Sequence, residues 1–306
     1  LYGNYVIDNK KIEAELGIRL EYMNLQYDVN PSHPVYKSDG YDYFQPFPNL
    51  RFAYKINDRN RISVFYNRRV DRPNEVDIRI FPKYDDAEII KVGNPALRPQ
   101  FTNSIELGYK NNFAKGSFYG ALYHRFSDGT ITRIATTVPG SNIIYAIFQN
   151  AGKSYVSGAE LLLSQTVSKK YSFSLNANGY HNQINAFTVE NRYPTPHSFS
   201  AAKQSAFSGN VKFNNNFSLA NKAGAQLSIV WLAPDIIPQG KIASRFSVDA
   251  GFKKALQKGR GELFINANDL FNTMVIKKHI QGNDFKYSSA DYYETQVFRL
   301  GYSYKF

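Results

Sequence analysis

Apolar and polar residues alternate along most of this chain. In the clearest stretch, residues 171–179, serine and asparagine separate four apolar side chains: Tyr171, Phe173, Leu175 and Ala177. Because side chains of a strand point alternately to opposite faces, this period predicts β-strands with one apolar and one polar face. The same pattern recurs at 104–110, 223–231, 245–253 and 298–306, and no helical period of convincing length occurs.

Short polar turns separate these predicted strands. They are rich in Asn, Asp, Gly and Lys, the residues typical of tight hairpins, and lie at 8–10, 57–60, 114–116, 168–170, 220–222 and 257–260. Their spacing leaves room for two strands and one long loop in each interval. About thirteen strands are therefore expected. The long loops are predicted at about 28–46, 71–99, 127–142, 185–203, 233–242 and 274–290.

The fold class follows from this arrangement. Strands of about a dozen residues exceed the usual five or six of globular sheets. Short turns on one side and long loops on the other are typical of an all-β, transmembrane, antiparallel up-and-down β-barrel. A soluble all-β sandwich with its polar faces outward is the alternative. Residues 1–8 look like the end of a strand, and bacterial barrels close with an even strand count, so we expect residues 1–306 to be N-terminally incomplete.

Composition supports an envelope protein. The 306 residues include 23 Tyr and 23 Phe but no Cys, which avoids mispairing in an oxidising compartment. No window holds the roughly 18 apolar residues of a membrane helix. The net charge of +12 does not favour nucleic-acid binding, because the basic residues are spread through turns and loops. It fits contact with anionic lipid headgroups, or a basic lumen that attracts anionic solutes.

Several motifs resemble those of the TonB-dependent outer-membrane receptors. Residues 92–109 are similar to the family's GNPxLxPE run, with Gln100 in place of the usual glutamate. The other three motifs resemble its xGxEL, NDLFN and Y..R..RP segments, at 157–161, 268–272 and 66–73. The resemblance implies a 22-stranded barrel with an N-terminal plug domain. This chain would then supply about 13 strands from the C-terminal portion of the barrel, and the plug is absent from it.

The resemblance implies a function and a location. It implies a receptor in the outer membrane of a Gram-negative cell that takes up a scarce large solute (siderophore, peptide or glycan) with energy from the TonB complex. Arg98-Pro99-Gln100 stands where glycan importers usually have Trp-Glu, which slightly favours siderophore or peptide. A passive porin, or a structural barrel subunit of an outer-membrane assembly, is the alternative. The implied partners are outer-membrane lipid, lipopolysaccharide, the barrel-assembly machinery, the TonB complex through the missing plug, and a surface lipoprotein.

Candidate ligand-binding residues lie at the loop side. Arg68, Arg69 and Arg72 could hold a carboxylate or phosphate, and Tyr84 and Tyr193 could stack on a ligand. A solvated rim and ordinary loop aromatics are the plainer interpretations. Trp231 is predicted to anchor in the headgroup girdle. By the resemblance, Phe306, Tyr304 and Tyr302 form the assembly signal.

Enzymatic chemistry is not predicted. The five histidines are scattered outside any catalytic motif, although two of them, His124 and His181, could meet across neighbouring strands. No spacing of residues typical of a metal site and no phosphate-binding glycine loop occurs. We therefore expect no catalytic residue, metal or cofactor.

Overall fold

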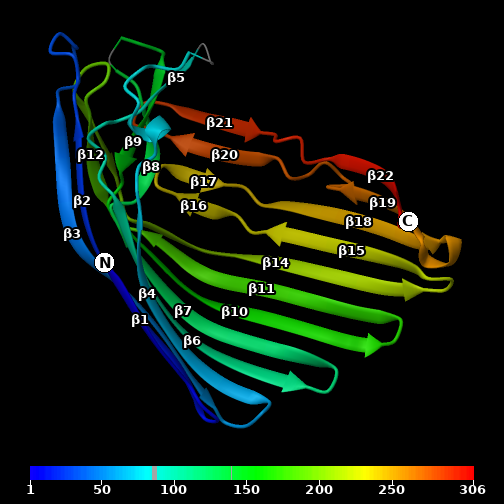
Figure 1. The fold of residues 1–306 in the computed structure, drawn as a ribbon. Helices are drawn as coiled ribbons and strands as arrows, with labels where there is room; N and C mark the ends of the chain where they lie inside the picture. Colours follow the sequence, from blue (N-terminus) through cyan, green and yellow to red (C-terminus); the bar gives the residue numbers. More distant parts are fainter. Residues whose placement is uncertain (85–87, 139) are drawn as a thin grey trace.

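A single antiparallel sheet dominates the computed structural model, which describes residues 1–84, 88–138 and 140–306. Its thirteen strands, each paired with the next of the sheet, confirm the predicted number and fold class (Figure 1). In order they are β1 (Tyr2–Asp8), β2 (Ile12–Tyr27), β3 (Asp39–Lys55), β4 (Asn60–Asp71), β6 (Gln100–Phe113), β7 (Gly116–Asp128), β10 (Lys153–Ser168), β11 (Tyr171–Ile184), β14 (Gln204–Leu219), β15 (Ala223–Leu232), β18 (Arg245–Leu256), β19 (Gly261–Asn268) and β22 (Val297–Tyr304).

Short turns and long loops lie at opposite ends of this sheet. Figure 1 shows a curved wall with the hairpin turns at one end and the connecting loops gathered at the other. The predicted turn residues act as expected: Asn9 Oδ1 accepts hydrogen bonds from the backbone N–H groups of Lys11 and Ile12, and Asn57 Oδ1 does the same for Arg59. By the general rule for such barrels, the loop end is extracellular.

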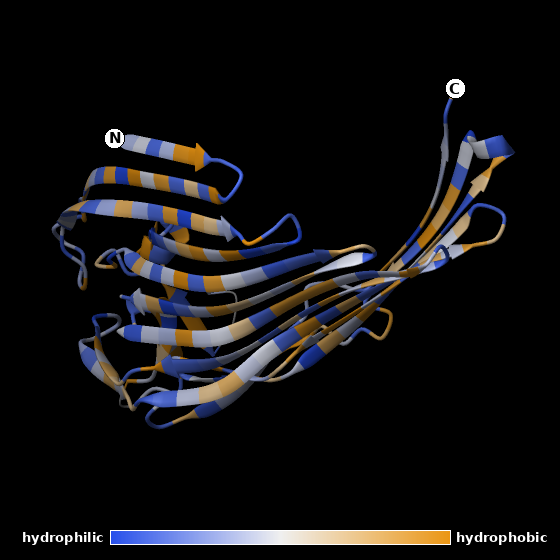
Figure 2. Ribbon diagram, turned by 90° about the horizontal axis from the view of Figure 1, so that it is seen from below, coloured by the Kyte–Doolittle hydropathy of each residue, from blue (hydrophilic) through white to orange (hydrophobic). Residues whose placement is uncertain are grey.

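One face of the wall is apolar and exposed. A row of outward side chains crosses five strands through Leu161, Ala177, Val211, Trp231 and Phe246. Figure 2 shows the hydrophobic and hydrophilic residues alternating along the strands. A soluble sandwich would have sealed Phe173, Leu227 and Phe246 between two sheets. They lie instead on one sheet and none is buried, so the sandwich alternative is wrong.

The other face is a polar ladder. Asn214 Nδ2 donates to Ser174 Oγ (3.2 Å), and Ser228 Oγ donates to Asn214 Oδ1 (2.8 Å). Glycines on this face let aromatic rings lie across the neighbouring strand. A Cβ at Gly158 would lie 2.7 Å from the Tyr123 hydroxyl, which itself donates to Asn178. That close approach explains the glycine of the 157–161 motif.

The predicted irregular loops contain small sheets, and the loop predictions were wrong in this respect. Residues 39–46 also belong to β3; Pro46 and Pro48 are tolerated there because β3 pairs with β4 only from Asn49 onward. The third loop extends to residue 152 rather than 142. Three sheets form within the loops: β5 (Ile89–Val92), β9 (Ile144–Asn150) and β8 (Ile131–Thr136); β12 (Phe187–Asn191) and β13 (His197–Ala201); and β16 (Asp235–Ile237), β17 (Gly240–Ile242), β20 (Ile276–Gln281) and β21 (Lys286–Asp291).

The buried apolar core lies in this layer of loops. One cluster joins Ile134, Phe187, Phe199 and Ile236 from three different loops, and a second is built around Tyr36, Tyr145 and Ile147. The loops are therefore held in place by packing against one another. The helical segments are α1 (Glu75–Ile78) and a 3₁₀ turn, Gln257–Gly259. No helix within the described ranges has the length and apolar character required to cross a membrane.

Candidate functional site

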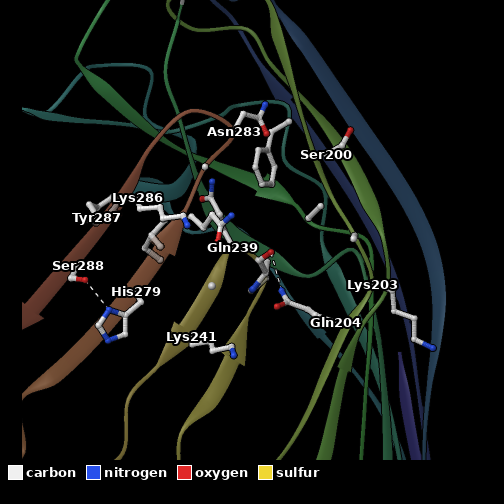
Figure 3. Close-up of a pocket in the computed structure, with 18 residues that line it drawn as sticks. Ser200, Lys203, Gln204, Gln239, Lys241, His279, Asn283, Lys286, Tyr287 and Ser288 are labelled. Carbon is white, nitrogen blue, oxygen red and sulfur yellow. Dashed lines mark hydrogen bonds between the residues drawn. The ribbon is translucent and has the colours of Figure 1, made fainter.

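A pocket of about 800 Å³ lies in the loop layer. One wall is the β16-β17-β20-β21 sheet, and the other is the segment from Phe199 to Gln204 (Figure 3). Lys241, His279 and Lys286 lie on the sheet wall, and His279 Nδ1 is 2.7 Å from Ser288 Oγ. In Figure 3 the side chain of Lys203, on the opposite wall, extends away from these three.

Two glutamines and a glycine hold the pocket walls together. Gln204 Nε2 donates to the carbonyl groups of Ile237 (2.7 Å) and Pro238 (3.2 Å). The Gln239 amide is buried and pairs with both backbone groups of Ala135 on β8, as a neighbouring strand would. Gly240 has φ +147°, and a Cβ there would lie 2.0 Å from the His279 carbonyl oxygen. Only glycine therefore allows β17 to approach β20 this closely.

A buried polar network joins the 92–109 motif to the neighbouring loops. Asn94 Nδ2 donates to Phe148 O (3.0 Å) and Gln149 Oε1 (3.2 Å). Gln149 Nε2 donates to Asn191 Oδ1 (2.5 Å), and Asn191 Nδ2 donates to Thr136 Oγ1 (2.9 Å). Asn191 is completely buried. The motif thus serves as an anchor for the loop layer, a role that its proline pattern alone did not predict.

Arg98 and Gln100 of the same motif also have defined partners. Arg98 donates to Asp39 Oδ2 (3.2 Å) and lies over the Tyr41 ring, 5.1 Å from its centroid. Gln100 Oε1 accepts from the backbone N–H of Ile131 at the start of β8 (3.0 Å). Glutamine at this position therefore ties β8, an edge strand of a loop sheet, to the barrel wall.

The two predicted ligand-stacking tyrosines lie together. Tyr84 is 71% exposed and lies close enough to Tyr193 to add to the effect of burial, which raises the pKa of the Tyr193 hydroxyl. Tyr193 meets Tyr145 edge to face at 5.8 Å, and burial raises the pKa of both Tyr193 and Tyr36. A polar pocket of about 170 Å³ lies nearby, between Asn94, Gln149 and Arg192. Stacking of a ligand on Tyr84 and Tyr193 remains a prediction.

The three predicted arginines do not converge on one site. Arg68 and Arg69 are successive residues of β4, so their side chains leave opposite faces. Arg68 lies over the Phe101 ring at 5.3 Å, while Arg72 pairs with the Glu21 carboxylate and donates to Tyr43 Oη. Arg69 is exposed, with no ion pair among the described residues. Ligand binding by these arginines stays a prediction, and Arg69 has the fewest competing contacts.

The 268–272 motif forms a clamp around a buried carboxylate. Asp269 accepts hydrogen bonds from Thr273 N (2.9 Å), Met274 N (3.2 Å) and Thr295 Oγ1 (2.7 Å), and its own N–H donates to Asp249. It therefore binds both ends of the loop that carries β20 and β21, one wall of the larger pocket. Burial acts to raise the pKa of Asp269, but these hydrogen bonds outweigh it and the pKa lies below its ordinary value.

We expect acidification to open this loop. A carboxyl with a lowered pKa stabilises the folded form above its unfolded pKa, and that stability is lost as the pH falls through the lowered value. The protection of residues 273–295 against hydrogen exchange, relative to the intrinsic exchange rate at each pH, should therefore fall below about pH 4, near the ordinary pKa of Asp. Asp269→Asn should weaken the loop at neutral pH and remove most of this pH dependence. An unchanged acid transition in Asp269→Asn would contradict the clamp.

The predicted assembly and girdle residues lie on the outer apolar face. Trp231 is 45% exposed and pairs with Phe246 near the loop end of β15. Phe298, Leu300, Tyr302 and Tyr304 form an exposed stripe on β22, and Phe306 follows with its ring 5.3 Å from Tyr304, edge to face. Their positions suit contact with lipid. The assembly signal and the girdle anchor remain predictions.

Deletion of Phe306 should lower the amount of protein in the outer membrane several-fold. A fully exposed Phe gains about 1.5–3 kcal/mol when an apolar environment covers it, and losses of 1–2 kcal/mol change cellular abundance several-fold. Quantitative blotting of outer-membrane fractions measures the effect. Phe306→Tyr is the matched control and should accumulate normally. Equal amounts of the deletion and the wild type would contradict the prediction.

The histidines and acidic residues form no described metal centre. His124 and His181 lie on β7 and β11, which β10 separates, so both flank Ser157 rather than meet. His124 Nδ1 lies 2.8 Å from Ser157 Oγ. Within residues 1–84, 88–138 and 140–306, no three or more His, Asp or Glu side chains are grouped to hold a metal ion.

Comparison with a family model decides the classification. The model of the Outer membrane protein beta-barrel family matches residues 1–304. The chain belongs to this family. This membership confirms the predicted β-barrel fold and the predicted location in the outer membrane. A search of curated proteins finds no match.

Solved structures of outer-membrane receptors and transporters share the fold of this family member. All of the chain aligns with 42% of the siderophore receptor PiuA from Acinetobacter baumannii (TM-score 0.67, 14% identity). The copper transporter OprC gives TM-score 0.67 and 12% identity over 99% of this chain and 46% of its own. The ferric yersiniabactin uptake receptor FyuA from Yersinia pestis aligns with TM-score 0.59 and 11% sequence identity, over 96% of this chain and 43% of FyuA. The chain thus spans less than half the length of these proteins.

Proposed function

We propose that this chain is the barrel portion of a TonB-dependent receptor that takes up a scarce large solute across the outer membrane. The observation that supports it most is the pocket of about 800 Å³, which the loop sheets build at the loop end of the barrel wall. A wall topped by packed loops suits selective capture better than free diffusion. Solved structures of like fold include receptors for a siderophore and for ferric yersiniabactin.

The proposal assigns roles to parts outside these residues. The remaining strands would complete the sheet at the edges of β1 and β22, and a plug domain would fill the lumen and contact the TonB complex. The polar inner face suits a hydrated plug, and the apolar outer face suits lipid and lipopolysaccharide. Delivery by the barrel-assembly machinery, and a surface lipoprotein over the loops, belong to the same proposal.

Uptake by the full-length protein tests the function. Cells with and without the gene should be compared for accumulation of labelled ferric siderophores, oligopeptides and glycans, each in a TonB-positive and a TonB-deleted background. We expect one class to bind at the surface in both backgrounds and to accumulate only with TonB. Accumulation that is independent of TonB, together with open-channel conductance in planar bilayers, would instead identify a passive porin.

A further inference from the structure

The β16-β17-β20-β21 sheet separates its charges between its two faces. Lys241 on β17 lies opposite His279 on β20, so both side chains leave the same face. Lys277 shares that face by alternation along β20, and so does Lys286, which pairs with Gln281. We call these four residues, Lys241, Lys277, His279 and Lys286, the basic face.

The carboxylates of this sheet lie on the opposite face. There Lys278 donates to Asp291 (3.1 Å), and Asp235 accepts from Tyr180 and Asn182 of the barrel wall. The basic face itself holds no Asp or Glu, and none is among the described residues that line the pocket. Asp284 lies in the turn between β20 and β21, outside the pocket lining. The basic face therefore carries no compensating carboxylate, and three of its four residues, Lys241, His279 and Lys286, line the cavity.

We propose that the basic face binds the carboxylate or phosphate groups of a soluble anionic ligand. Lysines held on one face of a small sheet repel one another, and an anion close to them relieves that repulsion while accepting charge-assisted hydrogen bonds. His279 and Ser288 add polar contacts at the same wall, and a pocket of about 800 Å³ accommodates a molecule of several hundred daltons. The net charge of +12 favours approach of anions over the whole surface.

The proposal also names the class of cargo. It rests on the proposed function in this one respect: if the barrel is an uptake receptor, its solute carries several negative charges. Lys277, His279 and Lys286 lie on the loop that Asp269 clamps. Lys241 lies on β17, which Gly240 allows to approach β20. These contacts hold the lysines in position before a ligand arrives, which reduces the entropy cost of binding.

Calorimetric titration of the full-length protein in detergent at low salt tests the binding site. The probes are citrate for carboxylates and pyrophosphate for phosphates. We expect the wild type to bind at least one probe and Lys241→Gln/Lys286→Gln to bind it about tenfold or more weakly, since the variant loses two charge-assisted hydrogen-bond donors. The matched control Lys278→Gln, on the opposite face, should bind as the wild type. Absence of binding by the wild type, or equal binding by the double variant, would overturn the proposal.

Two further measurements distinguish binding of a soluble anion from binding of lipid, and test the basic face separately from the receptor function. We expect micelles of lipopolysaccharide to compete only weakly with the probes. If the micelles bind only when both lysines are present, and neither probe binds, the basic face is a site for lipid phosphate and the solute proposal is overturned. Uptake assays of the same variants distinguish a failure of the basic-face proposal from a failure of the proposed receptor function. Uptake that needs TonB but survives intact in the double variant counts against the basic face alone, whereas lysine-dependent probe binding without TonB-dependent uptake counts against the receptor function alone.

Discussion

Arginine in place of Leu107 should destabilise the folded barrel by about 2–4 kcal/mol, the cost of a cationic side chain on the lipid face near the bilayer midplane. Leu107 lies halfway along β6, is 51% exposed, and has Val64 and Leu122 beside it on the outer face. Refolding of the full-length protein into lipid bilayers, followed across a urea titration, measures the change in free energy of unfolding.

The matched control places the same charge on the inner face. Gln226 on β15 is exposed among Asn216 and Gly251, so Gln226→Arg keeps its charge in water. We expect a change within about 0.5 kcal/mol, as for an ordinary surface substitution. A similar decrease in the free energy of unfolding of both variants would contradict the assignment of lipid to the outer face and water to the inner face.

Replacement of Asn191 by leucine should loosen the whole layer of loops. It removes the hydrogen bonds that Asn191 makes with Gln149 Nε2 and Thr136 Oγ1, which keep only Glu190 O and His197 Nε2 as partners among the described residues, and each lost hydrogen bond costs roughly 0.5–1.5 kcal/mol. Hydrogen exchange of β8, β9, β12 and β13 should become faster by a factor of ten or more, since about 1.4 kcal/mol corresponds to tenfold. The main sheet should keep its protection, because its ladder does not depend on this network.

Thr188→Val on the same hairpin is the control for Asn191. Among the described residues, the Thr188 hydroxyl has Ser200 Oγ (2.8 Å) as its partner, at an exposed position, so its loss should change exchange little. Unaltered exchange throughout the loops of Asn191→Leu would mean that apolar packing alone holds the layer. The anchoring role given to Asn94 and Gln149 would then be wrong.

The barrel wall could be predicted from the sequence because its signals are local. Alternation fixes which side chains share a face, and Asn9 and Asn57 form the turns expected of them. The thirteen strands and the outward positions of Trp231 and Phe246 followed from those two signals. The loop predicted at 28–46 overlaps β3, because prolines are tolerated in a stretch of strand that has a neighbour on one side only.

The site could not be predicted in the same way. The strands within the loops are three to seven residues long, and some pair across long sequence separations, as β5 does with β9 and β17 with β20. Nothing in the sequence near Lys241 indicates that it will lie opposite His279. One signal was nevertheless available: Lys277, His279 and Gln281 alternate with isoleucine and Lys278, which indicates a strand with a polar, basic face.

The claim on which the account depends is that lipid covers the outer face and water covers the inner face. The chain has no cysteine, so single cysteines at Ser104, Ile105, Glu106 and Leu107 of the full-length protein can each carry a spin label without background. In bilayers, we predict that 105 and 107 collide with oxygen and are shielded from a water-soluble nickel complex, whereas 104 and 106 show the reverse. Equal access of the nickel complex to all four positions would contradict the account.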